Sequence, residues 1–281
     1  MRIAFIYKYF PSLGGAERVM TVLANEFVEK GVEIVIYSFQ QELDQPAYLL
    51  DKAISILPLP DKRKIASSMN VDYLSNDLIK NEISILLNHD TISDSMLLCK
   101  KVKEKTGIPL ITLHHGQIYL PYSSLFSIVC IKQGFNIRKA LFPLYYLYVL
   151  VRECLHHKKN IRICDAYVVL SSSFQRQLGS SSKIQAIGNP LSYSSFFDMS
   201  QYDKKENVVV MVGRISEFHK RFSLALKIWQ KIETNPAFSS WNFEIVGDGS
   251  DLAIVKKMIS ELGLQRVIMT GYANPEPYYK R

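Results

Sequence analysis

Residues 1–37 read MRIAFIYKYFPSLGGAERVMTVLANEFVEKGVEIVIY, and this stretch contains a complete strand–helix–strand unit. The apolar run Ile3–Tyr7 predicts a buried strand, and the apolar residues of Ala16–Lys30 recur at helical spacing. Gly31 ends that helix, and Val32–Tyr37 predicts a second strand. Strands joined in this way are typical of a parallel sheet that is buried on both faces.

The same pattern repeats along the whole chain. Helices are predicted at Ser95–Lys105, Arg221–Ile232 and Asp251–Leu262, with the start of another near Pro275. The remaining apolar runs predict eight further strands: Ile54–Leu57, Ile83–Asn88, Ile108–Leu113, Ala166–Leu170, Lys183–Ile187, Val208–Val212, Phe243–Val246 and Val267–Thr270.

Gly188-Asn189-Pro190 interrupts this series, and the residues up to Asn207 lack a clear period, which indicates a linker. We therefore predict an α/β protein with two Rossmann-like domains, residues 1–190 and residues 191–281. The second domain has only three predicted strands. Because domains usually contain about 100–150 residues, either this domain leans on the first one or the sequence is cut short and the domain is incomplete.

The composition is that of a folded, intracellular protein. Of the 281 residues, 48% are hydrophobic and 21% are charged, which excludes a disordered chain. Four cysteines occur without a C-x-x-C pair, which favours reduced thiols over a disulfide framework: Cys99, Cys130, Cys154 and Cys164. The N-terminal apolar run is too short for a signal peptide, so we expect a cytoplasmic location.

The positive charge is concentrated in residues 131–164. The chain has a net charge of +8, and this segment contains seven Lys or Arg residues and one Glu, hence +6. Because the rest is nearly neutral, we expect no nucleic-acid partner. The apolar run Ala140–Val151 is too short to span a bilayer, but its tyrosines and its flanking Lys and Arg residues suit the inner surface of a membrane. A buried helix with a basic end explains the same pattern.

Three glycine-containing turns follow predicted strands, where ligands bind in open α/β folds. Gly14-Gly15 stands at the start of a helix and suits a phosphate or a sugar hydroxyl. A strand-to-helix turn that binds no ligand could have the same sequence. Gly213-Arg214, with Lys220 six residues later, suits a diphosphate, although both cations could simply be solvated. The turn at Gly247 is no dinucleotide fingerprint, because position 252 is Leu rather than Gly.

His114-His115 ends another predicted strand, and adjacent side chains on an extended chain point in opposite directions. The two histidines are therefore a poor metal pair, but one of them can face a ligand. No other metal-ligand spacing occurs, so we expect no protein-held metal. The G-x-S-x-G and G-x-x-x-x-G-K-[ST] motifs are also absent, which excludes the commonest hydrolase and NTPase signatures.

Taken in order, these features resemble family 4 of the retaining glycosyltransferases over essentially the whole chain. The motifs that carry the resemblance are Gly14-Gly15-Ala16-Glu17, His114, Asp165–Ser173, Gly188-Asn189-Pro190, Val212-Gly213-Arg214 with Lys220, Val246-Gly247-Asp248-Gly249, Leu262-Gly263-Leu264 and Val267–Tyr272. The resemblance implies a GT-B fold, with an N-terminal acceptor domain, a C-terminal domain for a nucleotide-diphosphate sugar, and a cleft between them. It implies no cofactor beyond this co-substrate.

The resemblance also implies roles for single residues. Arg214 and Lys220 would hold the donor diphosphate and stabilise the leaving group, and His114 would contact the sugar near the reacting carbon, with His115 as the alternative. Further donor or substrate contacts are implied at Gly14, Gly15, Asn189, Gly213, Gly247, Gly271 and Tyr272. The implied acceptor is a cell-envelope glycan, such as lipopolysaccharide or capsule, or a lipid-linked glycan.

One family element is missing from the sequence. The E-x7-E pair, which holds the sugar and the ribose in the family, would follow Arg281. We therefore expect a truncated, and potentially inactive, form of the family. Two alternatives stay open: a non-catalytic GT-B relic that acts as a binding protein, and a GT-B sugar-nucleotide epimerase. A dehydrogenase is disfavoured by the lack of a dinucleotide fingerprint.

Overall fold

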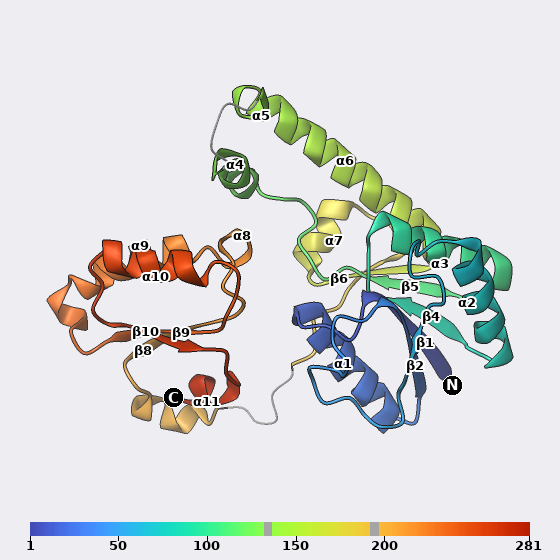
Figure 1. The fold of residues 1–281 in the computed structure, drawn as a ribbon, viewed down its shortest axis with the longest axis horizontal. Helices are drawn as coiled ribbons and strands as arrows, with labels where there is room; N and C mark the ends of the chain where they lie inside the picture. The colour runs from blue at the N-terminus through green and yellow to red at the C-terminus, as the bar shows by residue number, and fades with distance from the viewer. Residues whose placement is uncertain (132–136, 192–196) are drawn as a thin grey trace. The chain divides into compact units, whose positions relative to one another are not determined.

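A computed structural model describes residues 1–131, 137–191 and 197–281. The chain forms two compact units, Met1–Ser192 and Tyr193–Arg281, and each is built of parallel strands and helices (Figure 1). The prediction of an α/β protein with two parallel sheets is confirmed. The predicted linker lies partly in residues 192–196, outside the described residues, and continues into a 3-10 helix at Met199–Lys204.

The first unit contains a seven-stranded parallel sheet with the order β3-β2-β1-β4-β5-β6-β7. Every strand coincides with a predicted one, within a few residues at each end. The strands are β1 (Arg2–Tyr9), β2 (Glu33–Gln40), β3 (Ser55–Pro58), β4 (Ile85–Asn88), β5 (Leu110–Leu113), β6 (Ala166–Val169) and β7 (Ile184–Ala186).

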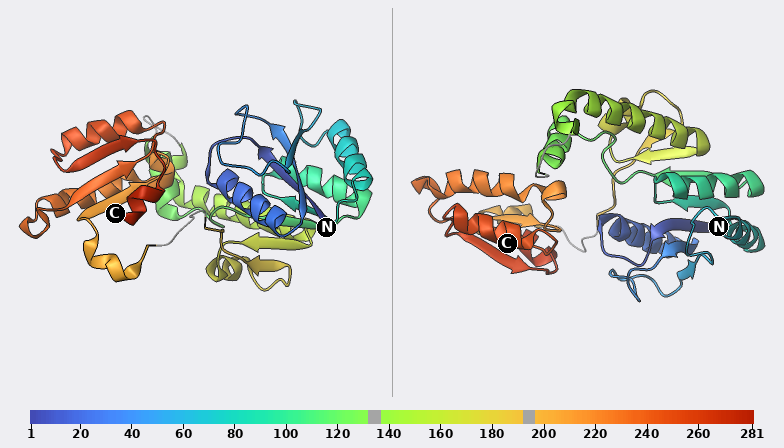
Figure 2. Two further views of the ribbon diagram at one scale, coloured as in Figure 1. Left: turned by 90° about the horizontal axis from the view of Figure 1, so that it is seen from below. Right: turned by 45° about the horizontal axis from the view of Figure 1, so that its top comes forward.

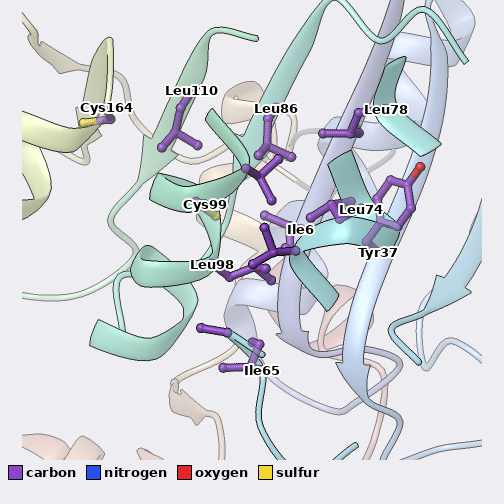
Figure 3. Packing of buried hydrophobic residues seen from close by; sticks show 14 of the residues in the cluster. Ile6, Tyr37, Ile65, Leu74, Leu78, Leu86, Leu98, Cys99, Leu110 and Cys164 are labelled. Carbon is purple, nitrogen blue, oxygen red and sulfur yellow. The ribbon is translucent and has the colours of Figure 1, made fainter. Parts of the chain in front are cut away.

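Helices cover both faces of this sheet (Figures 1 and 2). Phe5 faces the core beneath α1, whereas Ile6 faces the larger core beneath α2 and α3, which Figure 3 shows. This alternation is why the strand is apolar at successive positions. The helices are α1 (Gly15–Glu29), α2 (Ser68–Lys80), α3 (Ser93–Thr106), α4 (Tyr122–Ile131), α5 (Ile137–Ala140), α6 (Phe142–Ile163) and α7 (Ser172–Leu178).

The sequence pattern does not clearly predict α2, because Asn, Asp and Ser residues of low helix propensity lie between its apolar positions. The helix is stabilised by a capping side chain and by packing against the core. The Ser67 side chain accepts a hydrogen bond from the Asn70 backbone N–H and so caps the helix. Leu74 and Leu78 are fully buried in the larger core. Tertiary packing thus outweighs a weak helical propensity.

The second unit contains three parallel strands in the order β10-β9-β8, again as predicted. They are β8 (Val208–Val212), β9 (Asn242–Val246) and β10 (Val267–Gly271). Helices α9 (Phe222–Glu233) and α10 (Leu252–Glu261) pack on one face around the buried Trp229. Two short helices, α8 (Glu217–Lys220) and α11 (Glu276–Lys280), complete the unit.

On the opposite face of this small sheet, a buried carboxyl group is paired. Glu244 of β9 forms an ion pair with Arg281 at 3.1 Å and accepts a hydrogen bond from Thr270 Oγ1 at 3.0 Å. Arg281 also pairs with Glu206 at 2.7 Å. A carboxyl group that is buried in a sheet needs such partners, since an unpaired buried charge is costly.

Candidate active site

The carboxyl ends of the parallel strands bring several predicted residues to one edge of the first sheet. The Gly14-Gly15 turn follows β1, His114 and His115 follow β5, and Asn189 follows β7. One further residue at this edge, His89, follows β4, which lies between β1 and β5. Ligands of open α/β sheets bind at this edge, so these residues form the candidate site of the first unit.

The carboxyl group of Glu17 lies over the Gly14-Gly15 turn. A Cβ atom on Gly14 would lie 2.3 Å from Glu17 Oε2, whereas a Cβ on Gly15 would meet no atom within 4 Å. Glu17 is buried and accepts hydrogen bonds from Ser12 Oγ at 2.8 Å and from the Tyr7 hydroxyl at 3.1 Å. Burial and the Glu17 carboxylate raise the pKa of Tyr7, so this hydroxyl keeps its proton. A carboxylate at the turn accepts a hydrogen bond from a sugar hydroxyl but repels a phosphate, so the turn suits a sugar better.

The two adjacent histidines diverge, as expected for an extended chain. His114 uses both ring nitrogens: Nδ1 lies 3.2 Å from Thr91 Oγ1, and Nε2 lies 3.0 Å from the Gln117 carbonyl oxygen. Its ring packs edge-on against His157, with 5.0 Å between the ring centroids. Burial lowers the pKa of His114. The imidazole of His114 is therefore already occupied by neighbours within its own unit.

His115 points toward the other residues of the candidate site. Its Nε2 lies 3.2 Å from His89 Nδ1, and its Nδ1 is fully buried. Burial lowers the pKa of His115, whereas a hydrogen bond with the Asn189 side chain and the nearby Glu17 carboxylate both raise it. His115 therefore lies near Asn189 and Glu17. Of the two adjacent histidines, His115 is the one beside His89 and these two residues.

His89 was not singled out in the sequence, although its position carried a signal. It stands immediately after the predicted strand Ile83–Asn88, at the strand end where ligands bind in this class of fold. The structure buries it to 2% exposure. Buried polar side chains at such an edge are strong candidates for a role at the site.

The lowered pKa of His157 predicts how the stability of the first unit depends on pH. Its ring is buried, with Nδ1 3.0 Å from the Tyr167 hydroxyl and Nε2 2.9 Å from the Ile118 carbonyl oxygen. Burial lowers the pKa of His157 from 6.5 to about 4. Between these two pH values the unfolded chain binds the extra proton, so the free energy of unfolding falls as the pH drops.

We expect His157 to reduce the free energy of unfolding by about 3 kcal/mol between pH 6.5 and pH 4, with no effect above pH 7. Hydrogen-exchange protection of the β5 and β6 amides, measured across this range, checks the prediction. His157→Gln should flatten the dependence. An equally steep pH dependence in wild type and variant would show that other groups control acid stability.

In the second unit, glycines let two loops pack directly against each other. The Gly213 N–H donates to the Val246 carbonyl at 3.0 Å, and the Ile215 N–H donates to the Asp248 carbonyl at 2.8 Å. A Cβ atom on Gly247 would lie 2.0 Å from the Gly213 carbonyl oxygen. Gly247 also has φ +153°, which only glycine adopts readily.

The predicted cations lie at this pair of loops. Lys220 lies along Gly213, since a Cβ on that glycine would be 3.2 Å from Lys220 Cε. Both Arg214 and Lys220 are exposed. The Gly247 N–H donates to the Gly271 carbonyl at 2.7 Å, and the neighbouring Tyr272 is 70% exposed. Within the residues that the structure describes, no cluster of His, Cys, Asp and Glu could hold a metal ion.

The chain matches two family models. Residues 13–192 match the model described as Glycosyltransferase Family 4, and residues 194–281 match the model described as Glycosyl transferases group 1. Among curated proteins, the chain is 23% identical over 292 residues to GalNAc-alpha-(1->4)-GalNAc-alpha-(1->3)-diNAcBac-PP-undecaprenol alpha-1,4-N-acetyl-D-galactosaminyltransferase of Campylobacter jejuni. The match covers the whole of this chain and 71% of that protein.

Solved structures of other proteins share this fold. The lipopolysaccharide outer core galactosyltransferase WaaB, in its apo form, has a TM-score of 0.64 at 22% identity, over 99% of this chain and 70% of that chain. HepE from Anabaena, in complex with UDP, has a TM-score of 0.61 at 17% identity, over 99% and 71%. The fold is therefore GT-B, as predicted. With the family model matching residues 13–192, the chain belongs to glycosyltransferase family 4.

Proposed function

We propose that this glycosyltransferase moves a hexose-type sugar from a UDP- or GDP-sugar to a cell-envelope or lipid-linked glycan, with retention of configuration. Residues 191–281 would bind the donor, and residues 1–190 would bind the acceptor. The observation that carries the proposal is the placement of Arg214 and Lys220 at one glycine-lined strand edge. The relative from Campylobacter jejuni, by its name, acts on an undecaprenol-linked glycan, and HepE was solved with UDP.

The chemistry follows from the charge that develops on the leaving group. When the bond between the anomeric carbon and the diphosphate breaks, negative charge grows on the bridging oxygen. Arg214 and Lys220 would stabilise that charge, which lowers the barrier because the interaction strengthens in the transition state. The Gly213, Gly247 and Gly271 backbones allow the diphosphate to approach closely.

In the first unit, we propose His115 rather than His114 as the sugar contact. His115 lies near Asn189 and Glu17, the carboxyl group over the Gly14-Gly15 turn, whereas both ring nitrogens of His114 contact Thr91 and Gln117. A hydrogen bond from His115 to a sugar hydroxyl would orient the anomeric carbon for attack by the acceptor.

The paired variants His115→Ala and His114→Ala test this choice. We expect His115→Ala to lower kcat by about 100-fold, because one well-placed hydrogen bond in the transition state is lost. His114→Ala should lower kcat by less than about tenfold. Release of UDP or GDP from the nucleotide sugar, with an acceptor extract present, gives the rate. A larger loss in His114→Ala would restore His114 as the sugar contact, and equal, small losses would contradict a histidine role.

We also propose that the first unit contacts the inner face of the membrane through the segment 131–164. Residues 132–136 lie outside the described residues. Along α6, five large apolar side chains are each 50–65% exposed: Leu144, Leu147, Tyr148, Val151 and Leu155. Their spacing places them on one side of the helix. Such a contiguous exposed apolar stripe is unusual and marks an interaction surface.

The charges and shape of α6 favour a lipid surface. Arg152, Lys158, Lys159 and Arg162 flank the stripe on the same helix, and basic residues are attracted to anionic lipid headgroups. An apolar hollow of about 290 Å³ adjoins the stripe and is lined by Tyr119, Leu150, Val151 and Cys154. Within the described residues, no helix is both long and apolar enough to cross a bilayer. The one-sided apolar stripe and the basic residues beside it suit a helix that lies along the surface.

Co-sedimentation with vesicles of phosphatidylglycerol and phosphatidylethanolamine tests this contact. We expect Leu147→Glu/Val151→Glu to weaken vesicle binding by about 100-fold, because two apolar side chains that would contact lipid are replaced by charged ones. The matched control is Leu49→Glu/Ile79→Glu, which makes the same change at two exposed positions outside α6. Equal binding by both double variants, or no binding by the wild type, would contradict the proposal.

A further inference from the structure

The turn that carries Lys220 contains a strained residue. Arg221 ends α8 and immediately precedes α9, and its backbone is left-handed, with φ +52° and ψ +51°. Residues with a side chain rarely adopt this conformation, because the Cβ atom crowds the following carbonyl oxygen. Such strain persists only where the surrounding structure holds it. The contacts that hold Arg221 therefore also determine where its neighbour Lys220 lies.

The Glu217 side chain spans the strained turn. Its Oε2 accepts a hydrogen bond from the Ser223 backbone N–H at 2.9 Å, and its Oε1 accepts one from the Ser223 hydroxyl. Ser223 lies in the first turn of α9, where backbone N–H groups have no partner within the helix. The carboxylate thus caps α9 and closes a loop over residues 217–223. Lys220 and Arg221 lie within this loop.

Both ends of the loop are attached to well-ordered parts of the second unit. At one end, the Glu217 backbone N–H donates to Oδ2 of Asp251, the N-cap residue of α10, at 2.7 Å. At the other end, Phe222 and Leu226 of α9 are fully buried in the core. Because Glu217 bonds to both α9 and the start of α10, it fixes the turn relative to the helices that cover the sheet.

The closed loop places the Lys220 side chain against the end of β8. The Lys220 backbone N–H donates to the Ser216 carbonyl oxygen at 2.9 Å. The Arg221 N–H donates to the Glu217 carbonyl oxygen at 3.0 Å. A Cβ atom on Gly213 would lie 3.2 Å from Lys220 Cε and 3.8 Å from Lys220 Nζ. A long, exposed lysine side chain is costly to order, so a fixed backbone reduces what a ligand must restrain.

We infer that Glu217 is a positioning residue for Lys220: its carboxylate holds the α8–α9 turn closed and so keeps the Lys220 side chain beside Gly213. A contact between Lys220 and a donor diphosphate rests on the proposed function. The restraint of the turn does not, because it follows from the hydrogen bonds of Glu217 and the left-handed backbone of Arg221.

Hydrogen exchange of the Lys220 and Arg221 amides in the full chain tests the restraint without a ligand. We expect Glu217→Ala to raise both exchange rates by about tenfold, because a turn without its cap opens more often. Glu217→Gln retains a side-chain oxygen that can accept from Ser223, so its rates should stay within about threefold of the wild type. Unchanged exchange in Glu217→Ala would overturn the inference.

Glu233→Ala is the matched control. Glu233 is the last residue of α9, and its Oε1 accepts hydrogen bonds from the Gln265 and Arg266 backbone N–H groups at 2.7 Å and 2.8 Å. The substitution therefore also removes a carboxylate that accepts two hydrogen bonds, but at the opposite end of the helix. Exchange in the α8–α9 turn should stay within about twofold of the wild type. An equal rise in Glu233→Ala and Glu217→Ala would overturn the inference, because general loosening of the unit would explain both.

A double-mutant cycle then connects the turn to ligand binding. UDP and GDP are titrated into the full chain by calorimetry, and the nucleotide that the wild type binds is used for the variants. We expect Glu217→Ala to weaken binding by about tenfold in the wild type but by less than about twofold in the Lys220→Ala background, because Glu217 acts through Lys220. Equal losses in the two backgrounds would overturn the positioning role.

The two measurements separate this inference from the proposed function. If Lys220→Ala binds the nucleotide as tightly as the wild type, or the folded wild type binds neither nucleotide, the diphosphate contact of the proposed function fails. The exchange rates then decide by themselves whether Glu217 holds the turn. If exchange rises in Glu217→Ala and the cycle shows coupling to Lys220, both the restraint and its role in donor binding are supported.

Discussion

Replacing both Arg214 and Lys220 by alanine is expected to lower kcat/KM for the nucleotide sugar by about 1000-fold. Hydrogen bonds to charged groups contribute about 1.5–3 kcal/mol each, and each 1.4 kcal/mol corresponds to a factor of ten. Because charge grows on the diphosphate as the sugar leaves, much of this loss should appear in kcat as well as in donor affinity. Steady-state release of UDP or GDP, measured against donor concentration, gives both quantities.

The control for this variant removes the same amount of charge elsewhere in the second unit. Lys227 on α9 and Lys256 on α10 are both exposed. Lys227→Ala/Lys256→Ala should retain kcat/KM within about threefold, because surface charges far from the ligand contribute little. A comparable loss in the two double variants would mean that net charge, and not a diphosphate site at Gly213-Arg214, controls the reaction.

Gly247→Ala is expected to destabilise the second unit by about 3 kcal/mol. The new Cβ atom would lie 2.0 Å from the Gly213 carbonyl oxygen, and φ +153° is strained for any residue with a side chain. Both tryptophans of the chain, Trp229 and Trp241, lie in the second unit, so urea unfolding followed by tryptophan fluorescence reports on this unit alone.

Gly263→Ala is the matched control for this substitution. Gly263 also has a positive φ, +66°, but a Cβ atom there would meet nothing within 4 Å. We expect a loss of about 1 kcal/mol, which is the cost of the left-handed conformation alone. If Gly247→Ala were no more destabilising than Gly263→Ala, the two loops would not pack together as closely as described.

The strands could be predicted from the sequence because each is an apolar run with a turn signal after it. All ten strands within the described residues coincide with predicted ones. The position of the predicted cations also followed from the sequence, since strand ends in a parallel sheet share one edge. Strands and turns are recognised from residues that are close together in the sequence, so the sequence is sufficient to predict them.

The arrangement of the histidines could not be predicted in the same way. Alternation along a strand predicts that His114 and His115 diverge, but it does not say which of them lies beside His89 and which beside Thr91. That outcome depends on β4 lying between β1 and β5, which brings His89 beside His115. The buried Glu17 over Gly14 is likewise a tertiary feature. Strand order and side-chain packing, rather than local pattern, determine these details.

Binding of UDP and of GDP to the 281-residue chain, measured by isothermal titration calorimetry, tests the central proposal most directly. We predict saturable binding of one of the two nucleotides with a 1:1 stoichiometry, and its loss in Arg214→Ala/Lys220→Ala. Circular dichroism of the same samples establishes that wild type and variant are folded. If the folded wild-type chain binds neither nucleotide, or if the double variant binds as well as the wild type, the proposed donor site is contradicted.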